Sequence, residues 1–470
     1  MMTTVENADL IPPKRALWKI WGKRFFLGWL LFMLVGTAAN WRNIYAVATF
    51  NPFLFGPDYP KPTSAAEARD QDFDYLLTLT EIDRSFSPEA AKQFQTLLQT
   101  QREDLTASPE ADFLAMAEAV ALADNGHTNL TYSPLWHDFA SIDLRFSLFA
   151  DGIFITEAAQ AHAALIGQRA VALDNRPIAE VKDGLAQYRG GNAVWRLNIV
   201  PSFLITPSVL HAAGLTDQPD QITFTLADTE GVETIITLDA GSPAAERDTE
   251  NWVKITRPDD SALPVTLQDW RAPVSRTLPH KGHYVRMPQG FRAGDQSIKA
   301  FLQDVYDGLA AGSQDYLIAD FRGNSGGNYG LSAKFAKQIS DRLTPDGTLY
   351  LVTDKDTFSA AIVITALIKY HSESRAVIIG EPMGDREAFW AERGKTFRLP
   401  NRGWYVNYAT GFHDWGGECQ RERYCFTRNI PHDVAAGSLA PDVDIPMTFE
   451  DYKRGRDPVL DYILAAEGAL

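Results

Sequence analysis

Three short stretches of the chain carry residues that could together hydrolyse an acyl bond. Ser359 lies between a strand-like run, "TLYLVT", and an apolar helical pattern, so it stands at the start of a predicted helix. The loop "RGNSGGN", residues 322–328, follows a second strand-like run, "DYLIADF". His127 follows the glycine that ends a predicted helix in "ALADNGHTNL". A serine nucleophile needs a base and hydrogen-bond donors for the oxyanion, and these stretches offer both.

Each feature also has a structural interpretation. A serine before a helix usually caps it, a glycine-rich loop is usually a turn, and a loop histidine is usually solvated. The two loops, however, follow consecutive predicted strands, and functional loops of open α/β sheets lie beyond the carboxyl ends of strands. The pair is therefore more specific for catalysis than either loop. Gly326, Gly327 and the amide of Ala360 would supply the oxyanion donors.

Strands and helices alternate from residue 298 onward, which predicts a parallel sheet covered by helices within a catalytic domain over residues 270–470. Residues 71–135 have helical apolar spacing, and "SPE" occurs twice there as a helix-start signal. Residues 140–245 have the pattern of strands and turns and predict a β-rich module. Residues 43–70, rich in proline and aromatic residues, are expected to form a linker or an arm packed on the surface.

The N-terminus has the composition of a membrane anchor. Residues 1–24 are basic, and the run that follows, "FFLGWLLFMLVGTAA", carries no charge. This run is shorter than the roughly 20 residues of a spanning helix, but aromatic residues flank it. We predict a single signal anchor over residues 25–42, with residues 1–24 in the cytoplasm and the catalytic domain on the periplasmic or extracellular side. A cleaved signal peptide that leaves a secreted protein, and a buried helix, are the alternatives.

Charge and cysteine content limit the function further. The chain has 470 residues and a net charge of −16, which argues against a nucleic-acid-binding surface. Its two cysteines, Cys419 and Cys425, predict a local disulfide in an exported domain, with two free thiols as the alternative. No paired histidines stand near them, and no HExxH motif occurs, so neither a metal nor another cofactor is expected. The sequence leaves the oligomeric state open.

Four segments, "ADNGHTNL", "DYLIADFRGNSGGN", "DTFSAA" and "RAVIIGEP", together resemble the tail-specific (C-terminal processing) serine peptidase family, which includes the core of tricorn protease. The similarity is strongest over residues 315–382, shorter over 122–130 and looser in the tail "GRDPVLDYIL". The middle is weakly similar to the second half of a PDZ-like module. The resemblance implies a Clp protease/crotonase-like α/β core and endopeptidase cleavage of polypeptides through an acyl-enzyme.

The resemblance also assigns the site. The nucleophile of the family falls on Ser359, and its oxyanion hole falls on Gly326 and Gly327 with the amide of Ala360. One branch of the family uses a lysine base, but the corresponding loop here, "GEPMGDREAF", contains no lysine. The other, tricorn-like branch uses a histidine, and His127 matches it. One departure is that the tricorn-type site has a serine just before its histidine, where this chain has glycine.

A carboxylate that orients the histidine completes the tricorn-like site. Glu418 is the predicted residue, with Asp414 and Glu381 as alternatives. Because Glu418 directly precedes Cys419, the predicted disulfide could hold its loop rigid. Two other functions fit the same residues: a catalytically inactive, membrane-tethered scaffold that binds peptides, and an esterase or amidase. The absence of a GxSxG motif argues against the common α/β-hydrolase route.

Overall fold

The structure is a computed structural model. It describes residues 25–26, 28–30, 33, 36, 40–41, 44–51, 57–258, 264, 266–267, 273–287, 292–293, 296–392 and 394–469. The predicted basic segment, residues 1–24, lies outside the described residues, as do many residues of the predicted anchor over 25–42.

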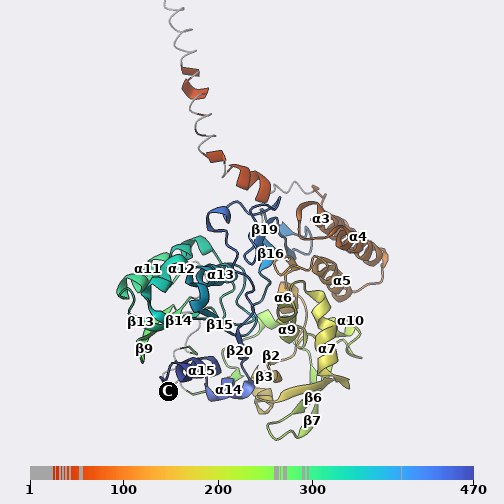
Figure 1. The fold of residues 1–470 in the computed structure, drawn as a ribbon. Coiled ribbons are helices and arrows are strands. Elements are labelled where there is room, and N and C mark those ends of the chain that lie inside the picture. The colour runs from red at the N-terminus through yellow and green to blue at the C-terminus, as the bar shows by residue number, and fades with distance from the viewer. Residues whose placement is uncertain are drawn as a thin grey trace, which may run out of the picture.

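The described residues between 25 and 50 are helical and lie outside the body of the molecule at their N-terminal end (Figure 1). At the other end, Phe50 packs edge-on against Phe426, and the Thr410 hydroxyl donates to the Phe50 carbonyl at 2.7 Å. Residues 44–50 therefore form a docked helical segment, which agrees with the surface-packed arm that was the alternative to a linker. None of the helices that the structure describes combines the length and apolar character that crossing a membrane requires.

A six-stranded sheet forms the C-terminal half, with the order β20-β15-β14-β13-β10-β9. All neighbouring strands pair in parallel except β9, which is antiparallel to β10. The strands are β9 (Val274–Leu278), β10 (Gly282–Arg286), β13 (Gln314–Asp320), β14 (Leu343–Thr353), β15 (Ala376–Gly380) and β20 (Val443–Asp444). The helices of this half are α11 (Ile298–Gly308), α12 (Ala333–Gln338), α13 (Ala360–Ser372), α14 (Phe449–Arg454) and α15 (Pro458–Ala466).

Both faces of this sheet are buried, which explains the continuous apolar runs in its strands. Along β14, Leu349 and Leu351 pack into the core shared with α11, α12 and α13. Tyr350 and Val352 point to the opposite face, where α15 covers them. The carboxyl ends of β13 and β14 consequently open into two adjacent loops, residues 321–328 and 354–359.

A second, antiparallel sheet forms the β-rich module, with the order β2-β3-β4-β6-β7 and with β5 and β8 beside β4 and β3. Its strands are β2 (Leu144–Phe149), β3 (Gly152–Ala158), β4 (Arg169–Leu173), β5 (Arg176–Pro177), β6 (Gln221–Ala227), β7 (Glu233–Asp239) and β8 (Val253–Lys254). Its helices are α7 (Ile178–Leu185), α8 (Ala193–Leu197), α9 (Val200–Phe203) and α10 (Pro207–Ala212).

The N-terminal helices pack against this module in one continuous apolar core. They are α2 (Ala65–Leu77), α3 (Leu79–Ile82), α4 (Pro88–Glu103), α5 (Pro109–Ala121) and α6 (Ser133–His137). The two "SPE" start signals are confirmed, because Ser87 and Ser108 accept hydrogen bonds from the amides of Ala90 and Ala111.

Short strands join the N-terminal half to the C-terminal half. β1 (Asn129–Leu130) pairs with β18 (Tyr405–Asn407), which pairs with β17 (Phe397–Arg398). Two further pairs are β16 (Ala388–Ala391) with β19 (Gly411–Asp414), and β11 (Arg292–Ala293) with β12 (Gln296–Ser297). The pairing of β1 with β18 fixes the segment that follows α5 against the C-terminal half, and His127 lies in that segment.

Candidate active site

Ser359 occupies a strained turn between β14 and α13. Its backbone has φ 57° and ψ −120°, and its side chain makes no capping hydrogen bond to the helix that it precedes. Such a conformation costs a non-glycine residue on the order of 1–3 kcal/mol and is typical of functional sites. Ser359 thus stands at the helix start, as predicted, but its hydroxyl does not act as a cap.

Gly326 lies directly against this turn. A Cβ atom at Gly326 would come within 2.7 Å of the Ser359 Cβ and 3.1 Å of the Ala360 nitrogen, and its φ is +110°. No other residue type fits there without movement. The amide of Gly326, however, already donates to the Asn324 side-chain oxygen at 3.0 Å.

The amides of Gly327 and Ala360 are the other two candidates for oxyanion donors. Neither has a hydrogen-bond acceptor among the described residues. Gly327 also lines an open cavity of about 570 Å³, which extends to Tyr329, Glu392 and Arg428. Of the predicted oxyanion residues, Gly327 and Ala360 therefore have available amides, while Gly326 provides close approach.

Hydrogen bonds hold the glycine loop to the nucleophile loop. The Asp354 carboxylate accepts from the Gly323 amide at 3.0 and 3.1 Å, and the Thr357 hydroxyl donates to the Phe321 carbonyl at 3.0 Å. The Phe358 amide donates to the Asn324 carbonyl, also at 3.0 Å. Burial, reinforced by the nearby Asp356 carboxylate, raises the pKa of Asp354 to about 7.

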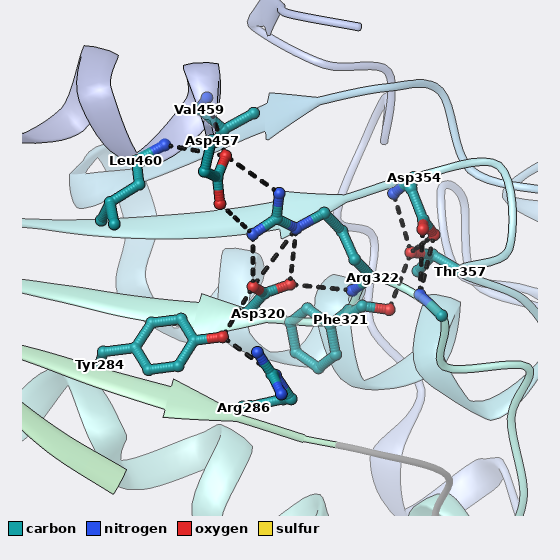
Figure 2. A network of polar contacts seen from close by, with 11 residues as sticks. Tyr284, Arg286, Asp320, Phe321, Arg322, Asp354, Thr357, Asp457, Val459 and Leu460 are labelled. Atoms are coloured by element: carbon teal, nitrogen blue, oxygen red, sulfur yellow. Dashed lines mark hydrogen bonds and ion pairs between the residues drawn. The ribbon is translucent and has the colours of Figure 1, made fainter. Parts of the chain in front are cut away.

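A buried charge cluster lies beneath these loops (Figure 2). Arg322 binds Asp320 at 2.7 Å and Asp457 at 2.8 Å, and Asp457 also caps the start of α15. Although burial disfavours both charges, the two carboxylates raise the pKa of Arg322, and Arg322 holds the pKa of Asp457 below its usual range. The cluster ties the tail segment "GRDPVLDYIL" to the base of the glycine loop, a role that the sequence analysis did not assign.

The loop of His127 is anchored by polar contacts of its neighbours. The buried Asp83 carboxylate accepts from the Thr128 hydroxyl at 2.7 Å and from the Ala409 amide at 2.8 Å. The Asn125 side chain donates to the same hydroxyl and accepts from the Trp390 amide. These bonds join the loop to the end of α3 and to β16.

The imidazole of His127 is held by rings. It is stacked between Phe358, 4.4 Å away, and Phe389, 5.3 Å away. Trp195 stacks on the outer face of Phe358 at 4.1 Å, and His413 stacks on Phe389 at 4.8 Å. We call this run of five rings, from His413 through Phe389, His127 and Phe358 to Trp195, the ring ladder. Since Phe358 precedes Ser359, the ladder brings His127 into the nucleophile region.

The carboxylate nearest to His127 is that of Asp385. Its Oδ2 lies 3.6 Å from the His127 Nδ1, and its side chain is 2% exposed. Neither nitrogen of His127 hydrogen-bonds to a described residue, and Asp385 Oδ2 has no such partner either. The pair is thus close enough for an ionic contact and slightly too far apart for a hydrogen bond.

The structure does not bring Glu418 to His127. The Glu418 side chain is exposed and accepts from Gln420 at 3.2 Å. The two alternatives are also occupied elsewhere, because Asp414 accepts from the amides of its own turn and Glu381 accepts from the Met447 amide. The sequence did place Asp385 in the loop where the other branch of the family carries its lysine, and that position was the available signal.

Cys419 and Cys425 form the predicted disulfide. It closes the loop that follows Glu418, and the Cys419 amide donates to Asp433 at 3.2 Å. The bridge therefore fixes the exposed turn that carries Glu418.

No protein-family model matches the chain, and no curated protein matches its sequence. Among solved structures, mature CPAF complexed with lactacystin aligns with a TM-score of 0.52 at 14% identity, covering 86% of this chain and 98% of that one. A CPAF mutant aligns with a TM-score of 0.54 at 13% identity, covering 86% and 96%.

The photosystem II D1 C-terminal processing protease aligns over 80% of this chain and 93% of its own at 13% identity, but its TM-score of 0.37 is too low to support an argument. At these identities the likeness to CPAF establishes a shared fold. The predicted α/β core with a β-rich module is confirmed at that level, and so is the fold implied by the family resemblance.

Proposed function

Because the chain has the fold of CPAF and holds Ser359 in a strained strand-to-helix turn, we propose that it is a serine endopeptidase. The Ser359 hydroxyl attacks the carbonyl carbon of a peptide bond, and His127 accepts the proton and returns it to the leaving amine. The amides of Gly327 and Ala360 bind the oxyanion. A water molecule then hydrolyses the acyl-enzyme through the same base.

The conformation of Ser359 is the observation that carries this proposal. A serine that only capped α13 would have an extended backbone and a side chain bonded to the helix amides. Ser359 has neither, and its strand–turn–helix setting is that of the nucleophile in other hydrolases. The strain at Ser359 is therefore best explained by presentation of its hydroxyl to a substrate.

We assign the third catalytic role to Asp385. Its carboxylate is buried against the imidazole edge of His127, whereas Glu418 points to solvent. A shift of less than 1 Å would convert the 3.6 Å contact into a hydrogen bond that fixes the tautomer of His127. Asp385 then stabilises the imidazolium that forms when Ser359 is deprotonated.

One observation favours a second candidate, the inactive scaffold. Ser359 and His127 share no hydrogen bond, and both imidazole nitrogens are without a described partner. Catalytic hydrogen bonds often form only when a substrate is bound, so the missing bond between Ser359 and His127 is compatible with activity. If the bond never forms, the protein binds peptides without cleaving them.

The test is labelling with a fluorophosphonate probe, followed by mass spectrometry of the labelled peptide. Wild type and the variants Ser359→Ala and His127→Ala are compared, with His280→Ala as a control at an exposed histidine. The proposal expects labelling at Ser359 that both active-site variants lose and the control keeps. A folded wild type that is not labelled supports the scaffold.

We also propose that the chain is anchored in a membrane with its catalytic half outside the cytoplasm, and that its substrates are exported or membrane-proximal polypeptides. The support is the basic segment followed by an uncharged apolar run, together with the exposure of Phe25, Phe26 and Trp29. Fractionation of cells that express the full chain tests this location. Recovery in the membrane fraction after a carbonate wash is expected, and recovery in the soluble fraction contradicts the proposal.

A further inference from the structure

Trp195 of the β-rich module touches the three loops that carry Ser359, His127 and Asp385. Its indole N–H donates to the Gly126 carbonyl at 3.3 Å, directly before His127. Its ring lies parallel to Phe358, directly before Ser359, at 4.1 Å and 6°. A Cβ atom at Gly384, directly before Asp385, would come 2.8 Å from the indole Cε3. One side chain thus contacts the residue that precedes each proposed catalytic residue.

The ends of helix α8 add two hydrogen bonds to the same loops. Asn192 caps α8 by accepting from the Trp195 amide at 3.0 Å, and its side-chain nitrogen donates to the Met383 carbonyl at 2.8 Å. Asn198, at the other end, donates to Asp356 at 3.1 Å. The helix is therefore joined to the loop of Asp385 at its start and to the loop of Ser359 at its end.

The indole is itself held in place. The Arg189 guanidinium lies over its ring at 4.2 Å, and burial lowers the pKa of Arg189. A Cβ atom at Gly191 would come 3.0 Å from the indole Cδ1 and 3.1 Å from the Gly126 Cα. Arg196 of the same helix contacts Asp124, which also pairs with Arg386. The module and the loops of His127 and Asp385 therefore meet at this helix without a gap.

We infer that Trp195 is a positioning residue through which the β-rich module sets the relative placement of Ser359, His127 and Asp385. The inference rests on the proposed function for the roles of these three residues. The ring ladder connects Trp195 through Phe358 to both His127 and the residue that follows Phe358, Ser359. Loss of the indole leaves the outer face of Phe358 uncovered, so that Phe358 can leave the imidazole of His127 and both reacting groups lose their fixed geometry.

The test compares Trp195→Ala, which loses the stack and the donor, with Trp195→Phe, which keeps a ring and loses the N–H. Trp252→Ala is the matched control, because Trp252 is also a partly buried tryptophan of the module and stacks on Arg145 away from the three loops. The first readout is hydrogen exchange, followed by mass spectrometry, of peptides that cover residues 122–129, 354–360 and 381–387. The second is the fluorophosphonate reaction, resolved into probe affinity and maximal labelling rate.

Trp195→Ala is expected to speed exchange in all three loops and to lower the maximal labelling rate at least about tenfold with little change in probe affinity. Trp195→Phe is expected to keep most of the wild-type protection from exchange and most of the maximal labelling rate. Trp252→Ala is expected to leave exchange in the three loops unchanged. If Trp195→Ala leaves exchange in the three loops at the wild-type level, or changes it no more than Trp252→Ala does, the inference is overturned. If the wild type is not labelled, the proposed function is contradicted but the inference about Trp195 is not. Hydrogen exchange of the three loops tests that inference independently.

Discussion

The nucleophile side and the base side of the site are built differently. On the nucleophile side, the loops after β13 and β14 are joined by hydrogen bonds between side-chain and backbone groups, and Arg322 anchors them from below. On the base side, the imidazole of His127 has no hydrogen bond to a described residue and is held between aromatic rings. Hydrogen bonds fix direction, whereas stacked rings restrict a plane and permit rotation within it.

This difference suggests where the site can move. Gly326 lies so close to the turn of Ser359 that an added Cβ atom would come within 2.7 Å of the Ser359 Cβ, so the geometry of this turn is preset. His127 can turn within the stack toward Ser359 without breaking a polar bond. We therefore expect that changes on the nucleophile side reduce stability and that changes on the base side reduce rate.

The largest effect is expected from Asp385→Asn on the base side. An amide cannot stabilise the imidazolium of His127, so the rate of peptide cleavage should fall by about 10³–10⁴-fold with little loss of stability. Glu418→Gln is the matched control and should change the rate less than about twofold. The opposite pattern, an active Asp385→Asn and an inactive Glu418→Gln, would show that the loop of Glu418 moves to His127 during catalysis.

The next effect belongs to the nucleophile side. Asp457→Ala leaves the buried Arg322 with one carboxylate fewer and removes the cap of α15, so the free energy of unfolding should fall by about 3–5 kcal/mol. Urea unfolding measures it. Asp461→Ala, on the same helix but without an ion pair to any described residue, should cost less than about 1 kcal/mol. Equal losses of unfolding free energy in the two variants would show that the Arg322–Asp457 ion pair does not stabilise the fold.

Gly326→Ala separates steric contact from backbone strain. Both Gly326 and Gly437 have positive φ, but a Cβ at Gly326 meets Ser359 at 2.7 Å, and a Cβ at Gly437 has no atom within 4 Å. Gly326→Ala should cost about 1–3 kcal/mol more than Gly437→Ala, and it should slow labelling of Ser359. Similar losses of stability and unchanged labelling would contradict the close packing of the glycine loop on the nucleophile turn.

The last predicted effect is a pH dependence of stability. The pKa of Asp354 is about 7 in the fold, above the roughly 4 of an unfolded aspartate. Between these values the folded chain holds a proton that the unfolded chain has lost, so this group makes the free energy of unfolding fall as pH rises from about 4 to about 7.

Asp354→Asn should flatten that slope in urea unfolding series at pH 5 and pH 8. Asp346→Asn, at an exposed position of β14, the strand that precedes Asp354, is the control. Identical slopes in wild type and Asp354→Asn would mean that Asp354 is ionised in the fold at both pH values.

The contrast between the two sides also explains what the sequence could predict. Ser359 and the glycine loop follow consecutive strands of one sheet, so local patterns were enough to place them together. His127 was found from a motif, but its surroundings were not, because Phe358, Phe389 and Trp195 come from three distant segments with no shared pattern. The ring ladder exists only after the module and the sheet have packed.

The carboxylate was harder to predict than the base. Glu418 was chosen because the tricorn-like site that the chain resembles includes a late carboxylate, but Glu418 lies outside the segments that carry the resemblance. Asp385 was visible in the sequence as the residue in the lysine position of the other branch, but only the fold shows that this loop faces His127. The Arg322–Asp457 pair likewise joins residues too far apart in the chain for a local pattern to connect.

The central claim is that the fold holds Ser359 in its reactive position, and that His127 hydrogen-bonds to Ser359 only when a substrate or inhibitor occupies the site. The most direct measurement is a crystal structure of the protein after reaction with the fluorophosphonate. The account predicts a phosphonyl group on Ser359, with the His127 Nε2 at about 3 Å from it and the Nδ1 hydrogen-bonded to Asp385. An adduct on Ser359 with His127 unmoved and unpartnered in the ring ladder would contradict the claim.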